Sequence, residues 1–200
     1  MVDLPKLYAR HAARFDAART GSTMERPYLE AAIALAPPPG QVLDLGCGGG
    51  EPIARHFIEK GYQVTGVDAV PEMLALARAR FPQMTWHQQD MRQLDLGQRF
   101  DIVIAWDSFF HLGPDDQRAM FEVFRRHTAA GGVLVFTSGV VEGEAVGGEL
   151  FGDQLYHASL DSAEYAWLLA WEGYVVVRHT VKDPACGDHT VWVAQLSSAT

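Results

Sequence analysis

A glycine-rich stretch flanked by acids is the part of this sequence that could hold a small ligand against the protein backbone. Residues Asp44–Gly50 have the sequence DLGCGGG, follow the apolar residues Val42 and Leu43, and precede Glu51-Pro52-Ile53. Glycine has no Cβ and adopts positive φ angles freely, and the start of a helix offers unpaired N–H groups. We therefore expect a strand, a tight ligand-binding loop and the first turn of a helix.

The charges beside this loop favour a cationic ligand over a phosphate. If the dinucleotide pattern G-x-G-x-x-G starts at Gly46, its third glycine position is occupied by Glu51. That carboxylate would lie where a pyrophosphate should meet the helix N-terminus. Asp44 adds a second acid at the end of the strand. A ligand with an ammonium and a sulfonium group, as in S-adenosylmethionine, suits two acids better.

Two more acids follow predicted strands. The strand 62–68 ends in Asp68, about two dozen positions after Asp44, the separation at which one strand–helix–strand unit brings a carboxylate to a ribose. Asp68 could also cap the helix expected from Pro71. Asp90 follows the strand expected at 84–87 and, taken alone, is only a polar residue at a strand end.

The DLGCGGG loop resembles the D/E-x-G-x-G-x-G loop of class I S-adenosylmethionine-dependent methyltransferases, and the order of elements after it is similar to that of the small-molecule members. The resemblance implies S-adenosyl-L-methionine as the cofactor. It places the methionine end on the glycine loop, the ribose on the second acid, and the adenine on the third acid and the residue after it. The implied cofactor-binding residues are Asp44, Gly46, Cys47, Gly48, Asp68, Ala69, Asp90, Met91 and Trp106.

Three histidines are candidates for removing a proton from an acceptor hydroxyl or ammonium, because histidine titrates near neutrality. We expect them at the rim formed by the carboxyl ends of the parallel strands. In order of preference they are His111, His157 and His189, and for each the alternative is a structural histidine bonded to the backbone.

No metal is expected. A zinc ion could use His179, Asp183, Cys186 and His189, but the Cys-x-x-His pair has no second close pair. A magnesium site that includes Asp107 has no other support in the sequence.

The predicted activity is methyl transfer by in-line displacement to a small-molecule acceptor. A non-catalytic S-adenosylmethionine-binding or sensor domain is the first alternative, followed by a nucleic-acid methyltransferase and then by an NAD(P) enzyme. Asp107-Ser108-Phe109-Phe110 lacks the Asn/Asp-Pro-Pro-aromatic sequence of the family's DNA-amino and protein-glutamine members. The net charge of −9, from 16 basic and 25 acidic residues, also repels nucleic acids and anionic membranes.

The chain has no apolar leader or long apolar stretch, and its two cysteines form no C-x-x-C pair. We therefore expect a cytoplasmic protein that does not rely on disulfides. The sequence identifies neither the acceptor nor the oligomeric state.

The expected fold is α/β and Rossmann-like: a doubly wound, mostly parallel seven-stranded sheet with an antiparallel last strand, plus N-terminal helices. We expect one methyltransferase domain over residues 1–200. It would comprise a helical cap at 1–40, a cofactor-binding core at 41–137, and a substrate-side loop, helix and C-terminal hairpin at 138–200. The glycine-rich segment 138–153 is expected to be a functional or mobile loop. Sequence order leaves open whether residues 1–20 act as a lid.

Overall fold

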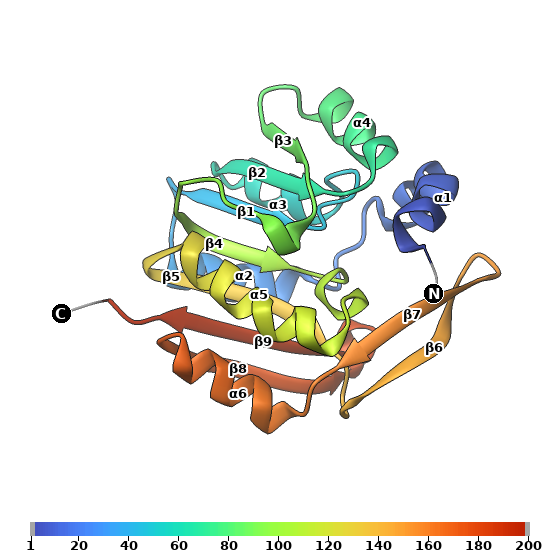
Figure 1. Cartoon of the computed structure of the whole chain (residues 1–200). Coiled ribbons are helices and arrows are strands. Elements are labelled where there is room, and N and C mark those ends of the chain that lie inside the picture. Colours follow the sequence, from blue (N-terminus) through green and yellow to red (C-terminus); the bar gives the residue numbers. More distant parts are fainter. Residues whose placement is uncertain (1–2, 199–200) are drawn as a thin grey trace.

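The computed structural model describes residues 3–198 and contains one seven-stranded sheet with the strand order β3-β2-β1-β4-β5-β9-β8 (Figure 1). Strands β1 to β5 pair in parallel, whereas β9 is antiparallel to both β5 and β8. The predicted sheet, including its antiparallel last strand, is confirmed. Its strands are β1 (Gln41–Leu45), β2 (Gln63–Asp68), β3 (Thr85–Gln88), β4 (Phe100–Ala105), β5 (Thr128–Ser138), β8 (Tyr174–Asp183) and β9 (His189–Leu196).

The strand order reverses between β1 and β4. The chain runs outward from β1 to β2 and β3, then returns to place β4 on the other side of β1. Loops that leave two neighbouring parallel strands in opposite directions open a crevice at the carboxyl ends of those strands. The sheet therefore positions a ligand site beyond the ends of β1 and β4.

Helices cover both faces of the sheet because its strands alternate two sets of apolar side chains. One set, which includes Val42 and Val135, packs with residues of α2 (Arg26–Leu35), α3 (Ile53–Glu59) and α4 (Pro71–Arg80). The other, which includes Leu43 and Phe136, packs with residues of α5 (Pro114–His127) and α6 (Ser162–Trp171). Burial of each large apolar side chain stabilises the fold by roughly 1.5–3 kcal/mol.

The N-terminal segment expected to form a cap holds two helices that lie in different places. Helix α1 (Leu4–Arg19) begins after Asp3, whose side chain accepts from the Lys6 amide, and it contacts α4. Helix α2 instead contacts β5 and β9. Figure 1 shows α1 beside the carboxyl ends of the strands and α2 behind the sheet.

The expectation of a long loop over 138–153 is wrong. Strands β6 (Gly143–Leu150) and β7 (Asp153–Ser159) form a separate antiparallel hairpin. Its turn contains Phe151 and Gly152, both with positive φ, as expected for a tight hairpin turn. Glycines and glutamates conceal the strand pattern in the sequence, and contacts with α1 supply the apolar partners: Leu150 and Leu155 pack with Leu7.

Three short 3₁₀ turns complete the chain: η1 (Met91–Gln93), η2 (Phe109–His111) and η3 (Pro184–Cys186). Within residues 3–198, no helix combines the length and the apolar character needed to cross a membrane.

A buried glutamine fixes η2 relative to β7 and α6. Gln117 is fully buried, and its amide nitrogen donates to the carbonyls of Leu112 (2.8 Å) and Ala158 (2.9 Å). Its side-chain oxygen accepts from the Tyr165 hydroxyl. One side chain thus satisfies three polar groups, of which the Ala158 carbonyl and the Tyr165 hydroxyl are buried.

Replacement of this glutamine tests that assignment. Gln117→Leu should lower the free energy of unfolding by about 2–3 kcal/mol, because two buried polar groups and one partly buried carbonyl lose their partner. Urea denaturation measures the change. Gln154→Leu, at an exposed position of β7, should shift it by less than about 0.5 kcal/mol. Equal effects would contradict the role of Gln117.

Candidate cofactor and acceptor site

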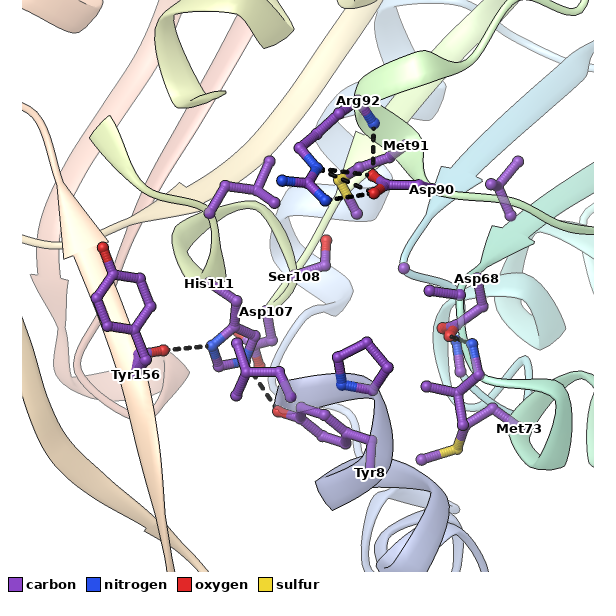
Figure 2. A pocket seen from close by; sticks show the side chains of 18 of the residues that line it. Tyr8, Asp68, Met73, Asp90, Met91, Arg92, Asp107, Ser108, His111 and Tyr156 are labelled. Carbon is purple, nitrogen blue, oxygen red and sulfur yellow. Dashed lines mark hydrogen bonds and ion pairs between the residues drawn. The ribbon is translucent and has the colours of Figure 1, made fainter. Parts of the chain in front are cut away.

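A cavity of about 560 Å³ lies beyond the ends of β1, β2 and β4 (Figure 2). Helix α1, the glycine loop, η1, η2 and the β6–β7 hairpin all contribute to its lining. Of the predicted cofactor residues, six line it: Gly46, Gly48, Asp68, Ala69, Asp90 and Met91. Of the three candidate histidines, His111 lines it.

The glycine loop is fixed to β2 by its backbone. The amides of Gly46 and Cys47 donate to the Val67 carbonyl at 2.7 and 3.1 Å. Gly46 has a φ of +77°, and a Cβ there would lie 2.2 Å from the Cβ of Ser108. A side chain cannot be accommodated at this position, and the backbone itself forms the wall of the cavity.

Asp68 joins this loop to the start of α4. Its Oδ2 accepts from the Gly48 amide and its Oδ1 from the Val70 amide, both at 2.8 Å. Each carboxylate oxygen keeps a second lone pair. Burial raises the pKa of Asp68. The side chain does not cap α4, since the N-cap residue is Val70.

Asp90 is bound by Arg92, which is not among the predicted site residues. The Arg92 Nε lies 3.0 Å from both Asp90 oxygens, and its Nη1 lies 2.8 Å from Asp116 Oδ2. Hydrogen bonding from Arg92 lowers the pKa of Asp90. Met91 contributes an apolar surface beside this ion pair (Figure 2).

Three predicted cofactor residues do not line the cavity. Asp44 is only 3% exposed, and burial, with a smaller effect of Asp68, raises its pKa to about 7. The buried Cys47 side chain belongs to the apolar core. The Trp106 ring stacks on His189, with 5.8 Å between the ring centroids. Of these residues, Asp44 can act on a ligand through its charge.

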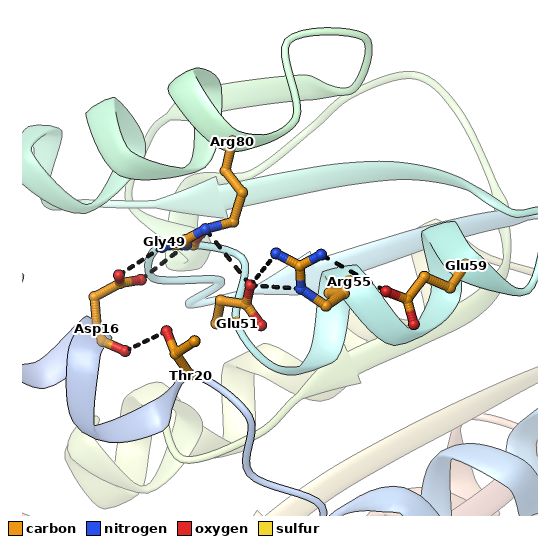
Figure 3. Close-up of polar contacts among 7 residues, drawn as sticks. All are labelled: Asp16, Thr20, Gly49, Glu51, Arg55, Glu59 and Arg80. Atoms are coloured by element: carbon orange, nitrogen blue, oxygen red, sulfur yellow. Dashed lines mark hydrogen bonds and ion pairs between the residues drawn. The ribbon is translucent and has the colours of Figure 1, made fainter.

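The interpretation that Glu51 faces a cationic ligand is wrong. Its carboxylate is buried and accepts from Arg55 Nε at 2.6 Å, and Arg80 Nε lies 3.5 Å away (Figure 3). Two guanidinium groups therefore neutralise it. The sequence could not reveal this, because Arg80 comes from a different helix.

Arg80 also ties α1 to the glycine loop (Figure 3). Its Nη1 and Nη2 donate to the two carboxylate oxygens of Asp16 at 2.9 and 2.7 Å, and Nη1 donates to the Gly49 carbonyl at 2.5 Å. Asp16 is 8% exposed. Helix α1, whose Tyr8 and Phe15 line the cavity, is thus held by a nearly buried ion pair.

On the opposite wall, Tyr8, His111 and Tyr156 form a hydrogen-bonded chain (Figure 2). His111 Nδ1 lies 2.8 Å from the Tyr156 carbonyl, which can only accept, so Nδ1 carries the proton. Nε2 then accepts from the Tyr8 hydroxyl at 2.9 Å. Burial lowers the pKa of His111 to about 4. His111 is a neutral imidazole with its basic nitrogen toward α1.

The other two candidate histidines lie elsewhere. His189 donates from Nε2 to Asp107 (2.8 Å) and from Nδ1 to the Cys186 carbonyl (2.6 Å), and the Asp107 hydrogen bond raises its pKa. It is therefore a cationic partner of Asp107 rather than a proton acceptor. His157 stacks on His111 at 4.9 Å and lines a second cavity of about 390 Å³. Burial lowers its pKa.

Several lining residues were not among the predicted site residues. The seven-residue spacing of Tyr8 and Phe15 marks one helical face, and Asp107 follows the central strand β4, so both could have been assigned from the sequence. The lining side chains outside the predicted site residues include Tyr8, Phe15, Met73, Arg92, Asp107, Ser108, Glu144 and Tyr156.

The residues considered for zinc are engaged elsewhere. His179 lies flat on Trp192 at 3.5 Å, and Asp183 accepts from the Tyr28 hydroxyl. Over residues 3–198, no three His, Cys, Asp or Glu side chains gather in a way that could hold a metal ion.

Comparison with known proteins agrees with this geometry. Residues 42–132 match the family model described as a methyltransferase domain. The chain is 36% identical over 102 residues to the dTDP-3-amino-3,6-dideoxy-alpha-D-glucopyranose N,N-dimethyltransferase of Streptomyces fradiae, covering 50% of this chain and 40% of that one. It is 27% identical over 147 residues to the dTDP-4-amino-2,3,4,6-tetradeoxy-D-glucose N,N-dimethyltransferase of Saccharopolyspora spinosa, covering 72% and 59%. The chain thus spans about half the length of these relatives.

Solved structures share the whole fold. The 1,6-didemethyltoxoflavin-N1-methyltransferase of Burkholderia thailandensis, with bound S-adenosylhomocysteine, has a TM-score of 0.74 at 22% identity and covers 97% of this chain and 87% of its own. CalS10, an amino pentose methyltransferase from Micromonospora echinaspora with bound S-adenosylmethionine, has a TM-score of 0.71 at 21% identity, with 98% of both chains covered.

A Rossmann-like sheet with a glycine loop at its switch point defines the class of protein. Residues 42–132 match the methyltransferase-domain family, and the fold of the chain is that of class I S-adenosylmethionine-dependent methyltransferases. The family and fold predicted from the sequence are confirmed, and S-adenosylmethionine is the cofactor of that family.

The ion pairs of Arg80 with Asp16 and Glu51 can be tested by measuring stability. Arg80→Gln should lower the free energy of unfolding by about 3 kcal/mol, because Asp16 stays nearly buried without its counter-charge and Glu51 keeps only Arg55. Adding Asp16→Asn should restore about 1 kcal/mol by removing one uncompensated carboxylate. Arg126→Gln, which breaks an exposed pair with Glu122, should cost less than about 1 kcal/mol in urea denaturation. A double variant less stable than Arg80→Gln would contradict this account.

The two rim histidines should differ in charge at pH 6. Burial lowers the pKa of His111, whereas Asp107 raises that of His189. Side-chain ¹⁵N NMR should therefore show a neutral, Nδ1-protonated His111 and a doubly protonated His189. His111→Asn and His189→Asn supply the assignments. The opposite charge states would contradict the hydrogen-bond roles given above.

The same shift predicts how His111 affects stability. Unfolded histidine titrates near a pKa of about 6.5, and the folded side chain at about 4. As the pH falls between these values, the unfolded chain takes up a proton that the folded chain does not. The advantage of the wild type over His111→Asn should be complete above about pH 6.5 and decrease toward pH 4, by at most about 1.4 kcal/mol per pH unit. An advantage that grows on acidification would contradict it.

Proposed function

We propose that this protein binds S-adenosylmethionine and transfers its methyl group to a small-molecule acceptor in the same cavity. The observation that carries the proposal is the division of the cavity into two walls. The glycine loop and Asp68 form one, and Tyr8, His111 and Tyr156 form the other (Figure 2). We propose that residues 3–198 act as one methyltransferase domain.

The residues of the first wall suit the cofactor. Gly46 and Gly48 line the cavity without side chains, so a ligand can approach the backbone of the loop. The free lone pairs of Asp68 suit two ribose hydroxyls, and Met73 and Met91 offer apolar surface for a flat ring. Asp68, which lines the cavity, supplies negative charge for a ligand with two positive groups.

The chain's own contribution is to bind and orient. When bound, S-adenosylmethionine supplies an electrophilic methyl group on a sulfonium. The protein holds the acceptor opposite that methyl and excludes water, which can lower the barrier by several kcal/mol. Helix α1 closes the cavity on one side through Tyr8 and Phe15. Residues 1–20 are thus proposed to contain the lid, of which Leu4–Arg19 is described.

Nitrogen is the favoured acceptor atom. Two relatives reported above are named as N,N-dimethyltransferases of amino sugars, and two of the solved structures as an N1-methyltransferase and an amino pentose methyltransferase. A sensor domain would need no second wall, and the charge of −9 disfavours a nucleic-acid substrate.

A single substitution tests the cofactor wall. Asp68→Asn should weaken binding of S-adenosylmethionine at least about tenfold in calorimetry, because an amide NH₂ would face the Gly48 or Val70 amide and the ribose would lose an anionic acceptor. Glu122→Gln, on the outer surface of α5, should bind as the wild type does. Unchanged affinity in Asp68→Asn would refute the ribose assignment.

Methyl transfer itself is tested with labelled cofactor and a metabolite extract. Label should appear in a small molecule only when the wild-type protein is present, and the product identifies the acceptor. Tight cofactor binding without any transfer would favour the sensor alternative. Salt-sensitive binding of RNA or DNA would favour the nucleic-acid alternative.

A further inference from the structure

We infer that the acceptor is an amine on a scaffold that carries no phosphate or carboxylate. This inference rests on the proposed methyl transfer and narrows its substrate class. It is based on the direction of the hydrogen bonds in the cavity wall and on the charges around it.

Three hydroxyl groups line the cavity, and each gives its only proton to the protein. Tyr8 donates to His111 Nε2, Tyr156 donates to Glu144 Oε2 at 2.8 Å, and Ser108 donates to the Leu45 carbonyl at 2.6 Å. A hydroxyl whose proton is committed can only accept from a ligand. These groups therefore offer lone pairs and no donor to an acceptor molecule.

His111 supplies no donor either. Its Nδ1 proton is directed to the Tyr156 carbonyl, and its Nε2 accepts from Tyr8. An ammonium or amine N–H finds partners on this wall, for example the Tyr8 oxygen. A carboxylate or phosphate oxygen would face other lone pairs, and leaving such a group unpaired costs more than one hydrogen bond gains.

The charges of the side chains that line the cavity also disfavour an anionic acceptor. Six acids line the cavity, and within the described residues Arg92 is the one lysine or arginine that does: the acids are Asp3, Asp68, Asp90, Asp107, Asp116 and Glu144. Asp68 and Asp90 belong to the proposed cofactor wall. On the acceptor side Asp107 is paired with His189 and Asp116 with Arg92, whereas Glu144 accepts only from Tyr156, so its charge is left to attract a cation.

The positive groups near this side are already paired. Arg92 binds Asp90 and Asp116, and His189 binds Asp107. The N-terminus of α5, at Gly113, could attract an anion, but Asp115 and Asp116 stand in its first turn. A nucleoside diphosphate needs several free cations or amides, and this wall provides none from its side chains.

The reaction balances for such an acceptor. The ammonium first releases one proton to water. The amine nitrogen then gives its lone pair to the methyl carbon, the S–CH₃ bonding pair stays on sulfur, and the product is the methylated ammonium. No co-reactant other than the cofactor is required.

Binding of simple probes tests the inference without knowledge of the natural acceptor. Benzylamine, benzyl alcohol, benzoate and benzyl phosphate are titrated by ligand-observed NMR into the full chain, with and without S-adenosylhomocysteine. Benzylamine should bind at least about tenfold more tightly than either anion, and more tightly than the alcohol. An anion that binds as well as benzylamine, or an amine no better than the alcohol, would overturn the inference.

A matched pair of hairpin variants locates the effect. Glu144→Gln should reduce the preference for benzylamine over benzoate at least about threefold, because it removes a charge and adds a donor. Glu149→Gln, on the same strand but outside the cavity lining, should leave the preference unchanged. An unchanged preference in Glu144→Gln, with far-UV circular dichroism like that of the wild type, would overturn the assignment to this wall.

The two proposals can fail separately. Calorimetry with S-adenosylhomocysteine tests the cofactor site alone, and the probe titration without cofactor tests the acceptor wall alone. Normal cofactor binding with anion-selective probes would refute the amine and keep the methyltransferase. Amine-selective probes without cofactor binding would refute the methyltransferase and keep the selectivity of the wall.

Discussion

The close approach of the glycine loop to the segment before η2 is the contact on which both walls of the cavity depend. Gly46 adopts a φ of +77° against Ser108, and the Ser108 hydroxyl donates to the Leu45 carbonyl at 2.6 Å. The loop forms the cofactor wall, while Ser108 begins the turn that carries His111. A larger residue at position 46 would separate the two walls by displacing one backbone from the other. The absence of a Cβ at this position therefore determines how closely the glycine loop and the segment before η2 approach each other.

The charged residues near the glycine loop fall into two groups: some hold the fold together, and others are available to a ligand. Asp16 and Glu51 are buried and both pair with Arg80, so these charges hold α1 against the glycine loop. Asp68 instead accepts only backbone amides, which leaves its negative charge without a cationic partner among its hydrogen bonds. Counting acids near the loop would assign all of them to the ligand. Their partners show that Asp16 and Glu51 hold α1 against the loop, whereas Asp68 is available to a ligand.

In the proposed acceptor wall, the hydroxyl protons point to protein atoms and leave lone pairs for a ligand. Tyr8, Tyr156 and Ser108 have donors as well as acceptors in the sequence, yet each donor is directed to a protein atom. A neutral His111 fits a reaction in which the protein positions an acceptor and the cofactor supplies the reactivity. His189, which the sequence ranks as a possible base, is instead paired with Asp107.

The sequence by itself determined the sheet, the loop and the family, because these follow from local patterns: buried strands, DLGCGGG, and acids at strand ends. Six of the nine predicted cofactor residues line the cavity for the same reason. The β6–β7 hairpin was not predictable, since its glycine-rich strands find apolar partners only on α1. Nor were the contact of Glu51 with Arg80, that of His189 with Asp107 or the direction of each hydroxyl proton. Those depend on groups brought together by the fold, and only the tertiary structure decided which charges and donors are left for a ligand.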